Sequence, residues 1–271
     1  GIDAVTPTLP VSYNWPNFRH RYYGASDAGY LNVRNFRGEV RMLDARKELR
    51  ISAGRGFQEF GRLPRIYYGL VARRCMDELT RRGGACFFGS SPDISGAVGL
   101  SVIVDTLAFV DAALFVPGSS ANSGAGKSGM KQHVGDLATS PQTSSFAADW
   151  PSVIPPIYSV QTVWAHAAVE TLKSLGEDSE VAKLNVGSLH AQTLVHNPRL
   201  ARIVLVSLGR QFTRGNYAVF THFVWALLWE VLTRAKGPIF HRFRRGHYRC
   251  VFRRGGISDV QEACAAFTNW E

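Results

Sequence analysis

The sequence predicts an α+β fold that is predominantly α-helical, with a small antiparallel meander near the N-terminus, a helical body and a basic β-hairpin near the C-terminus. Three observations predict this fold. Apolar and polar residues alternate from Leu31 onward, apolar residues recur at helical spacing through much of the chain after Pro64, and an arginine-rich segment near the C-terminus contains a glycine turn signal. A chain of 271 residues, 45% hydrophobic and 19% charged, can bury a substantial core. We therefore expect residues 1–271 to form one compact unit, a segment of a larger polypeptide or assembly.

The first fifty residues are predicted to form an arm and a meander. Residues 1–30 are rich in Pro, Gly, Tyr and Asn without a lasting period, which indicates an extended arm lying on another surface. After the arm, Arg37-Gly38 is a turn signal, so Arg34 and Arg41 would face each other across the first hairpin. The three predicted strands are 31–36, 39–43 and 48–52.

Two helices and a long loop are predicted to follow the meander. Pro64 suits a first helical turn, and the helix that follows it ends at Gly83-Gly84, behind two arginines. Asp93 is placed to cap a long apolar helix that runs toward Val116. Residues 117–156 are dominated by Gly, Ser, Ala, Thr and Pro, which predicts a long surface loop that is either a functional excursion or a flexible connector.

The second half of the chain is predicted to be more helical. Ser159 caps a helix over Val160–Leu175 that Gly176 stops, and Asn197-Pro198 separates two further helices, 189–195 and 199–212. Asn216 starts the most apolar helix, and a helix that is apolar all round is buried within a protein or between subunits. A final helix is expected from Ser258.

The most informative stretch is the basic segment, residues 231–258. It contains seven Arg, one Lys and no Asp or Glu, so it carries +8 of the +10 formal charge. With Arg245-Gly246 as a two-residue turn it would form a hairpin, with an apolar face and a cationic face. The apolar pairs would be Ile239 with Phe252, His241 with Cys250 and Phe243 with Tyr248; the cationic pairs would be Arg242 with Arg249 and Arg244 with His247.

Concentrated arginine interleaved with aromatic residues favours contact with a polyanion, in this case the phosphate backbone of RNA. The alternative interpretation is a solvated edge strand whose charges discourage aggregation. On the first interpretation the nucleic-acid-binding residues are Arg242, Arg244, Arg245, His247, Arg249, Arg253 and Arg254.

Residues 121–128 loosely match a phosphate-binding loop, with Ala121 where the first glycine normally stands. The residues at the cofactor-binding positions would be Gly126, Lys127 and Ser128. Such a loop needs a buried strand before it and a helix after it. Here residues 117–120 separate it from the preceding apolar run and Gly129 weakens a following helix, which favours a flexible Gly/Ser loop without a cofactor.

Other signatures of chemistry are missing from the sequence. The eight histidines are scattered, the four cysteines form no C-x-x-C pairs, and we find no H-E-x-x-H, G-x-S-x-G or paired-carboxylate pattern. The sequence therefore predicts neither an enzyme nor a metal site, and it predicts buried free thiols in a reducing compartment. The apolar runs 94–116 and 217–232 contain charged residues and are predicted to be core helices, so no membrane partner is expected. The chain begins without Met and without a secretory signal, which suggests processing from a longer chain.

A basic, helix-rich chain with an extended arm and a long surface loop resembles the largely α-helical capsid subunits of totivirus-like and quadrivirus-like double-stranded RNA fungal viruses. The resemblance implies a structural subunit of a closed shell, with other copies or sister chains as partners and an intracellular location in virus particles. It also implies that the basic segment faces packaged RNA.

Two alternatives stay open. Arginine-rich ribbons and extended arms equally suit an RNA-binding protein of a mitochondrial ribosome or another ribonucleoprotein. The second alternative is a nucleotide-binding enzyme that uses residues 121–128.

Overall fold

The computed structural model describes residues 1–271 except 22–23, 131, 214, 216, 244–249 and 271, and of residues 234–243 it describes the backbone only. Its contacts group into two compact units where the sequence predicted one. The first unit comprises residues 1–6, 42–108 and 134–243, and the second comprises residues 7–41, 109–133 and 244–271. The predicted fold class is confirmed, because the structure is mainly helical with small sheets.

The first unit is built around two buried helices, α3 (Pro92–Ile103) and α5 (Val160–Ser174), which pack against each other. Helix α3 contains many small residues, so other elements pack closely on nearly every side of it. At Gly99, the Leu79 side chain lies close to the backbone of α3. The helices α1 (Ala45–Gly54), α2 (Arg73–Gly83), α6 (Asp178–Val181) and α7 (Val186–His196) surround this pair.

Several predicted helix ends are confirmed. Ser159 caps α5 through a capping box with Thr162, in which each side chain bonds the other's backbone N–H. Helix α2 ends at Gly84, whose φ of 79° belongs to the left-handed region that glycine adopts without strain. Gly176, at φ +73°, follows α5 in the same way.

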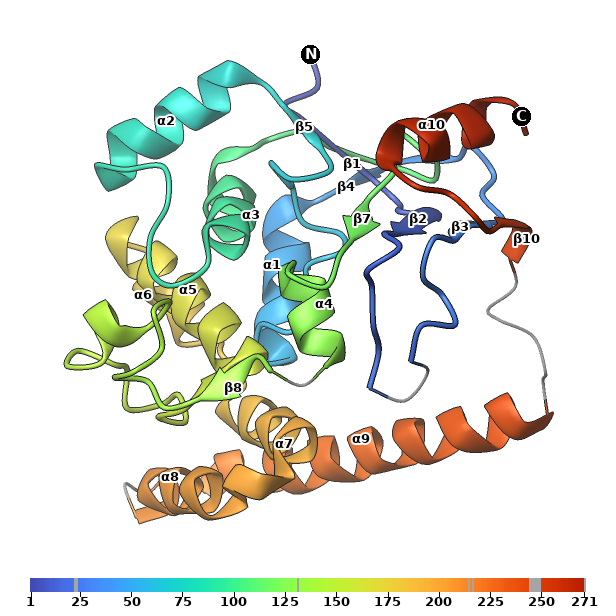
Figure 1. Ribbon diagram of the computed structural model, residues 1–271. Helices are drawn as coiled ribbons and strands as arrows, with labels where there is room; N and C mark the ends of the chain where they lie inside the picture. The colour runs from blue at the N-terminus through green and yellow to red at the C-terminus, as the bar shows by residue number, and fades with distance from the viewer. Residues whose placement is uncertain (22–23, 131, 214, 216, 244–249, 271) are drawn as a thin grey trace. The chain divides into compact units, whose positions relative to one another are not determined.

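In the first unit, α7 is followed by a short 3-10 turn and two further helices (Figure 1). The turn η2 (Pro198–Leu200) leads into α8 (Ala201–Thr213), and α9 (Tyr217–Phe243) follows. Helix α9 packs closely on α7 because Gly187 has no side chain: a Cβ there would lie 2.3 Å from the Val219 carbonyl oxygen.

The second unit centres on a four-stranded sheet with the order β10-β3-β2-β7. Its buried side chains include Tyr13, Leu31 and Val33, and the Tyr13 hydroxyl donates to the Ile257 carbonyl oxygen at 3.1 Å. The elements of this unit are β2 (Val11–Asn14), β3 (Leu31–Arg34), β7 (Gly118–Ser119), α4 (Gly124–Gly129), β10 (Cys250–Arg254) and α10 (Val260–Thr268).

Another sheet has the order β4-β6-β1-β5, and a short pair joins β8 to β9. The strands of the larger sheet are β1 (Ala4–Pro7), β4 (Val40–Leu43), β5 (Leu70–Val71) and β6 (Leu107–Val110). Strands β8 (Val134–Gly135) and β9 (Tyr158–Ser159) pair antiparallel, and η1 (Ser144–Phe146) lies between them in the sequence. The predicted loop over 117–156 therefore consists of short elements joined by turns.

The predicted N-terminal arm and meander differ from the structure. Residues of the arm form β1 and β2, with Ala4, Val11 and Tyr13 buried. The third predicted strand is wrong, because residues 48–52 belong to α1, where Leu49 and Ala53 recur at helical spacing and are buried. Strands β3 and β4 lie in different sheets, so Arg34 and Arg41 do not face each other.

Two predicted helices are shorter than expected. The helix predicted from Pro64 begins at Arg73, because residues 70–71 form β5 and pair with β1. The helix predicted to run toward Val116 ends at Ile103, and Ser91 rather than Asp93 is its N-cap residue. Beyond it, the backbone N–H groups of Asp105 and Thr106 donate to the Asp3 carboxylate at 2.9 Å and lead into β6.

The predicted C-terminal hairpin is wrong. Its first arm, up to Phe243, continues α9, so Ile239 and His241 are helical. Its second arm is β10, which pairs with β3: Cys250 lies opposite Arg34, and Phe252 lies opposite Val33. The predicted turn at Arg245-Gly246 lies outside the described residues. The two predicted arms therefore do not pair with each other. The first arm is part of a long helix, and the second pairs with a strand that is distant in the sequence.

Candidate interaction surfaces

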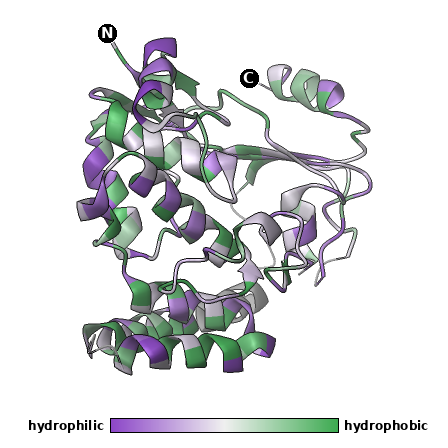
Figure 2. Cartoon of the chain, turned by 90° about the vertical axis from the view of Figure 1, so that its left-hand side faces the viewer, coloured by the Kyte–Doolittle hydropathy of each residue, from purple (hydrophilic) through white to green (hydrophobic). Residues whose placement is uncertain are grey.

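Helices α8 and α9 expose a set of large apolar side chains to solvent. Each member of the set is between 38% and 75% exposed, and the most exposed is Trp225. We name the set the α8–α9 apolar surface; it comprises Ile203, Leu205, Val206, Phe212, Tyr217, Phe220, Val224, Trp225, Leu228, Trp229, Val231 and Leu232. Figure 2 shows the hydrophobic residues along these helices at the bottom of the view.

This surface exists because α9 is mostly apolar around its circumference from Tyr217 to Thr233 but, over these residues, is covered on one side only. Val219 and Phe223, at 5% and 6% exposure, form a small core with Ala191 of α7 and Leu208 of α8. The opposite side of α9 carries Trp225 and Leu228, and these remain exposed. An apolar helix is expected to be buried all round. The residues of this chain leave the outer side of α9 uncovered.

The surface is continuous from one helix to the other. The Phe212 ring of α8 lies edge-on to the Tyr217 ring of α9, with ring centroids 5.0 Å apart, and its centroid is 6.2 Å from that of Phe220. A groove of about 430 Å³ runs beside these rings and is lined by Leu205, Leu208, Gly209, Phe212, Val219 and Phe220.

The α9 part of the surface is almost free of charge. From Tyr217 to Thr233 the sequence contains no Lys or Arg, and its one carboxylate, Glu230, is half-buried. The hydroxyl of Thr221 donates to the Ala218 carbonyl oxygen at 2.9 Å, and that of Thr233 donates to the Trp229 carbonyl oxygen at 2.9 Å. The polar atoms of these two side chains are therefore satisfied within the helix.

The predicted nucleic-acid-binding residues do not share one described element. The backbone of Arg242 lies in α9, whereas Arg253 and Arg254 lie on β10. Arg244, Arg245, His247 and Arg249 lie outside the described residues. Among the described residues, Arg242 and the pair Arg253 and Arg254 therefore do not form the cationic row of a hairpin.

Arg253 is engaged within its own unit. Its guanidinium group forms an ion pair with the Asp27 carboxylate at 2.8 Å, donates to the Asn32 side-chain oxygen at 3.1 Å, and lies 3.9 Å from the centroid of the Tyr30 ring. An arginine in these contacts secures β10 against β3 and the preceding loop. Arg254, the next residue, is exposed.

The loop at 121–128 does not have the geometry of a phosphate-binding loop. Helix α4 begins at Gly124, before the Gly126-Lys127-Ser128 triplet, and Ser123 caps it by accepting the Gly126 N–H. The Lys127 N–H donates to the Ser123 carbonyl oxygen at 2.9 Å. Two N–H groups that would bind phosphate are therefore used within the helix. Gly126 is required for packing, because a Cβ would lie 2.0 Å from the Ser120 carbonyl oxygen.

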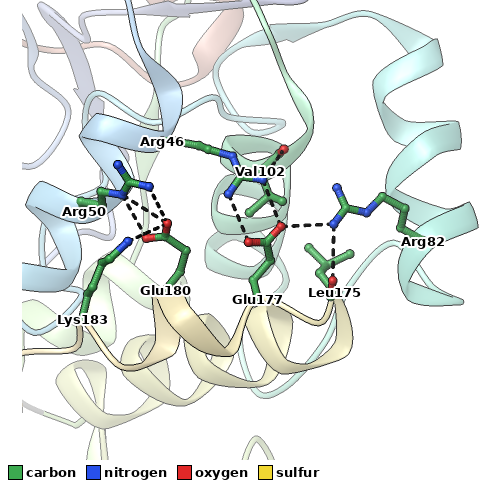
Figure 3. Close-up of polar contacts among 8 residues, drawn as sticks. All are labelled: Arg46, Arg50, Arg82, Val102, Leu175, Glu177, Glu180 and Lys183. Atoms are coloured by element: carbon green, nitrogen blue, oxygen red, sulfur yellow. Dashed lines mark hydrogen bonds and ion pairs between the residues drawn. The ribbon is translucent and has the colours of Figure 1, made fainter.

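Arginines of the first unit are paired with one buried and one partly buried carboxylate (Figure 3). Glu180, whose side chain is 3% exposed, accepts from Arg50 and Lys183, each at 2.8 Å. The guanidinium groups of Arg46 and Arg82 contact Glu177 at 3.0 and 3.2 Å. Hydrogen bonds from arginine hold the pKa of both carboxyl groups below the ordinary value. Arg46 and Arg50 thus join α1, and Arg82 joins α2, to α6 and the turn before it.

Two buried histidines are packed rather than free to react. His166 stacks on Trp150 with ring centroids 4.3 Å apart and shares a 3.0 Å hydrogen bond with the Ser90 hydroxyl. His190 lies 2.8 Å from the Val186 carbonyl oxygen and 3.0 Å from the Ser207 hydroxyl. Burial lowers the pKa of each imidazole to about 4. The Ser90–His166 pair resembles a nucleophile with its base, but both side chains are buried, and the rings of Phe146 and Trp150 pack against His166.

The described residues were also searched for metal-ligand clusters, for buried cysteines and for membrane-spanning helices. Within them, no group of three His, Cys, Asp or Glu side chains is arranged to hold a metal ion. All four cysteines are free, but only Cys75 is buried, and Cys264 is exposed, so the prediction of buried thiols is correct for one of the four. Over the same residues, we find no helix with both the length and the hydropathy needed to span a membrane.

Comparisons with protein-family models, with curated proteins and with solved structures find no match to this chain.

Proposed function

We propose that the chain is a structural subunit of a large multi-chain assembly, and that the α8–α9 apolar surface is where it joins other chains. The eight side chains that α9 contributes to this surface are on average more than half exposed, which corresponds to apolar area on the order of 1,000 Å². The largest apolar patch of a typical monomer is roughly 300–600 Å². A surface of this size supports a role in which another chain covers it.

The particular assembly that we propose is the capsid shell of a double-stranded RNA virus. The basic segment supports an RNA-containing particle, since +8 of the formal charge lies in 28 residues without a carboxylate. The RNA contacts are assigned to Arg242, Arg244, Arg245, His247, Arg249 and Arg254. Arg253 contributes less to them, because Asp27 already neutralises its charge.

Particle size is the experiment that tests assembly. Material purified from the cells that naturally produce the chain is measured by light scattering and negative-stain imaging, and we expect uniform large particles. The same measurement on material with Leu228→Glu should find no particles, while Ile51→Glu, at an exposed apolar position of α1, should leave them intact. A chain that is monomeric both in its native extract and after purification would refute the proposal.

The basic segment also favours a second candidate, an RNA-binding protein of a ribonucleoprotein such as a mitochondrial ribosome. Nuclease treatment separates the two. A shell is held together by contacts between protein chains and should keep its size after the RNA is digested. A ribonucleoprotein depends on its RNA scaffold and should fall apart.

The assigned RNA contacts are tested by salt dependence. Replacing Arg242, Arg244 and Arg249 with Ala should weaken RNA binding and lower the slope of log K against log salt by about one unit per lost phosphate contact. The matched control removes the same charge elsewhere, by replacing Arg55, Arg62 and Arg73 with Ala. Equal effects of the two triple variants would mean that net charge alone binds RNA.

A further inference from the structure

The outer side of α9 has the features of a permanent interface between identical chains. We propose that a second copy of this chain packs on α9 in antiparallel orientation, an inference that rests on the proposed function because it names the partner of the same surface. Transient interfaces are about as polar as the rest of a protein surface, whereas homodimer interfaces are more apolar and poor in charge. The stretch from Tyr217 to Thr233 has a single charged residue, Glu230, and it is half-buried.

One row of side chains on this face suits antiparallel self-pairing. Thr221, Trp225, Trp229 and Thr233 follow one another at intervals of four residues, so they share a stripe of the helix, and all four are exposed. The row reads the same in both directions. In a two-fold contact centred level with Leu227, Trp225 of each copy would meet Trp229 of the other, and each Thr221 would meet a Thr233.

Burying this row leaves neither threonine hydroxyl without a partner. Both threonine hydroxyls are already bonded to carbonyl oxygens of their own helix, and the indoles present large apolar faces. The small threonines at the two ends of the row would let the second helix come close there. At the centre of the row, the tryptophans of the two copies would stack. Such aromatic pairs favour offset or edge-to-face contact.

The area of the face is sufficient for a stable dimer. Six apolar residues lie on the outer side of α9: Val224, Trp225, Leu228, Trp229, Val231 and Leu232. At the exposed fractions given above they offer on the order of 800 Å² per copy, which is the amount that each partner buries in a standard interface.

A membrane surface fits the face less well than a protein does. Helices that lie in a lipid interface place Lys and Arg along the border of their apolar face. The face from Tyr217 to Thr233 has neither residue along its length; the Lys and Arg of α9, at positions 234, 236 and 242, all follow it in the sequence.

Sedimentation equilibrium of the purified full chain tests the proposal. We expect the smallest species over a wide concentration range to have twice the chain mass of 29.9 kDa. Leu228→Glu and Trp225→Glu should each raise the dimer dissociation constant by roughly 30-fold or more, since two-fold symmetry places every substitution in the contact twice. Ile51→Glu, a helical residue that is 42% exposed on α1, is the matched control and should not change it.

The antiparallel register has its own test. In the proposed pairing, Thr221→Lys combined with Thr233→Glu places opposite charges against each other across the interface, whereas Lys at both positions places like charges together. The Lys/Glu variant should therefore dimerise at least about tenfold more tightly than the Lys/Lys variant. Equal affinities, or the reverse order, would overturn the antiparallel pairing. Both positions are solvent-exposed, and circular dichroism of each variant confirms that the helix content is unchanged.

Three outcomes would overturn the inference. The wild-type chain could remain at 29.9 kDa at every concentration. The dimer could persist in Leu228→Glu and Trp225→Glu, which would place the contact elsewhere. The monomer could bind phosphatidylcholine vesicles in a Leu228-dependent manner, which would make lipid the occupant. If the purified chain is monomeric but native particles still require Leu228, the proposed function stands and the partner is a different chain.

Discussion

Glu180 illustrates how single residues stabilise the first unit. Its carboxylate is 3% exposed and accepts hydrogen bonds from Arg50 of α1 and Lys183, so it joins two helices that are far apart in the sequence. The Glu170–Lys173 pair of α5 has the same i, i+3 spacing, but its carboxylate is 32% exposed. The two glutamates therefore differ mainly in burial and in the arginine partner.

Replacing Glu180 with Ala should lower the free energy of unfolding by about 2 kcal/mol, because charged hydrogen bonds to α1 are lost. Glu170→Ala should cost less than about 0.5 kcal/mol, as is usual for an exposed ion pair. Urea titration monitored by circular dichroism measures both values. Equal losses in the two variants would show that the contact between Glu180 and Arg50 does not stabilise the fold.

His166 and His190 make the stability of the fold depend on pH. Burial lowers the pKa of each imidazole from 6.5 to about 4 in the folded chain. Between these values the unfolded chain binds protons that the folded chain does not. Stability is therefore fully present above pH 6.5 and is lost as the pH falls toward 4.

The loss should reach up to about 3 kcal/mol for each histidine at pH 4. Urea titrations at several values between pH 7 and pH 4 measure it. His190→Gln should reduce the change in stability over this range. An unchanged pH profile in His190→Gln would contradict the assignment.

At the scale of elements, a glycine determines how closely α7 and α9 pack. A Cβ at Gly187 would lie 2.3 Å from the Val219 carbonyl oxygen and 2.6 Å from the Phe223 backbone nitrogen. Both are backbone atoms, which move only if the helices separate. Gly209, in α8, has no atom within 4 Å of its own Cβ position.

The same substitution should therefore have opposite effects at the two positions. Gly187→Ala should destabilise the chain by roughly 2–3 kcal/mol through overpacking. Gly209→Ala should stabilise it by about 0.5–1 kcal/mol, because alanine favours the helix and nothing obstructs its methyl group. Thermal unfolding of the two variants measures this contrast, and a loss of stability in Gly209→Ala would contradict it.

Helices were predictable where the signal was local. Ser159 at the start of α5 and Gly84 after α2 mark their helix ends through hydrogen bonds or backbone angles that involve only neighbouring residues. Strands were less predictable, because β1, β2 and β10 each show only four or five residues of pattern. Their partners are distant: β10 pairs with β3, more than 200 residues away.

The candidate site was predictable in part. The apolar character of α9 is plain in the sequence, and it predicted burial inside the protein or between subunits. Which side of the helix would be covered depends on Gly187 and on the position of α8, and no local pattern reports either. The predicted cationic hairpin was wrong because a local pattern was present but misleading. Alternation near Arg242 suggested a strand, but the helix continues through it.

At the scale of the whole molecule, neither unit is contiguous in sequence. Each comprises three segments, and the chain passes between the units within β1, β4 and β6. The second unit depends on residues near both ends. Ile257, Ala263 and Ala266 are buried against a core that contains Tyr13 and Leu31.

Deleting residues 256–271 should therefore destabilise the second unit selectively. The loss of the buried Ile257 side chain and of α10 should cost roughly 4 kcal/mol. Amide hydrogen exchange of the shortened chain should become faster in β2 and β3, while amides of α5 keep their protection. Unchanged exchange in β2 would show that α10 does not complete this core.

The hydrogen bond from Tyr13 to Ile257 joins residues 244 positions apart. During translation, Ile257 is made 244 residues after Tyr13, so β2 must wait for that stretch of chain before its partner leaves the ribosome. Until then its apolar side chains lack their final cover, and chaperones or neighbouring nascent chains have access to them. We therefore expect the yield of soluble protein to depend on how quickly synthesis proceeds from β2 to Ile257.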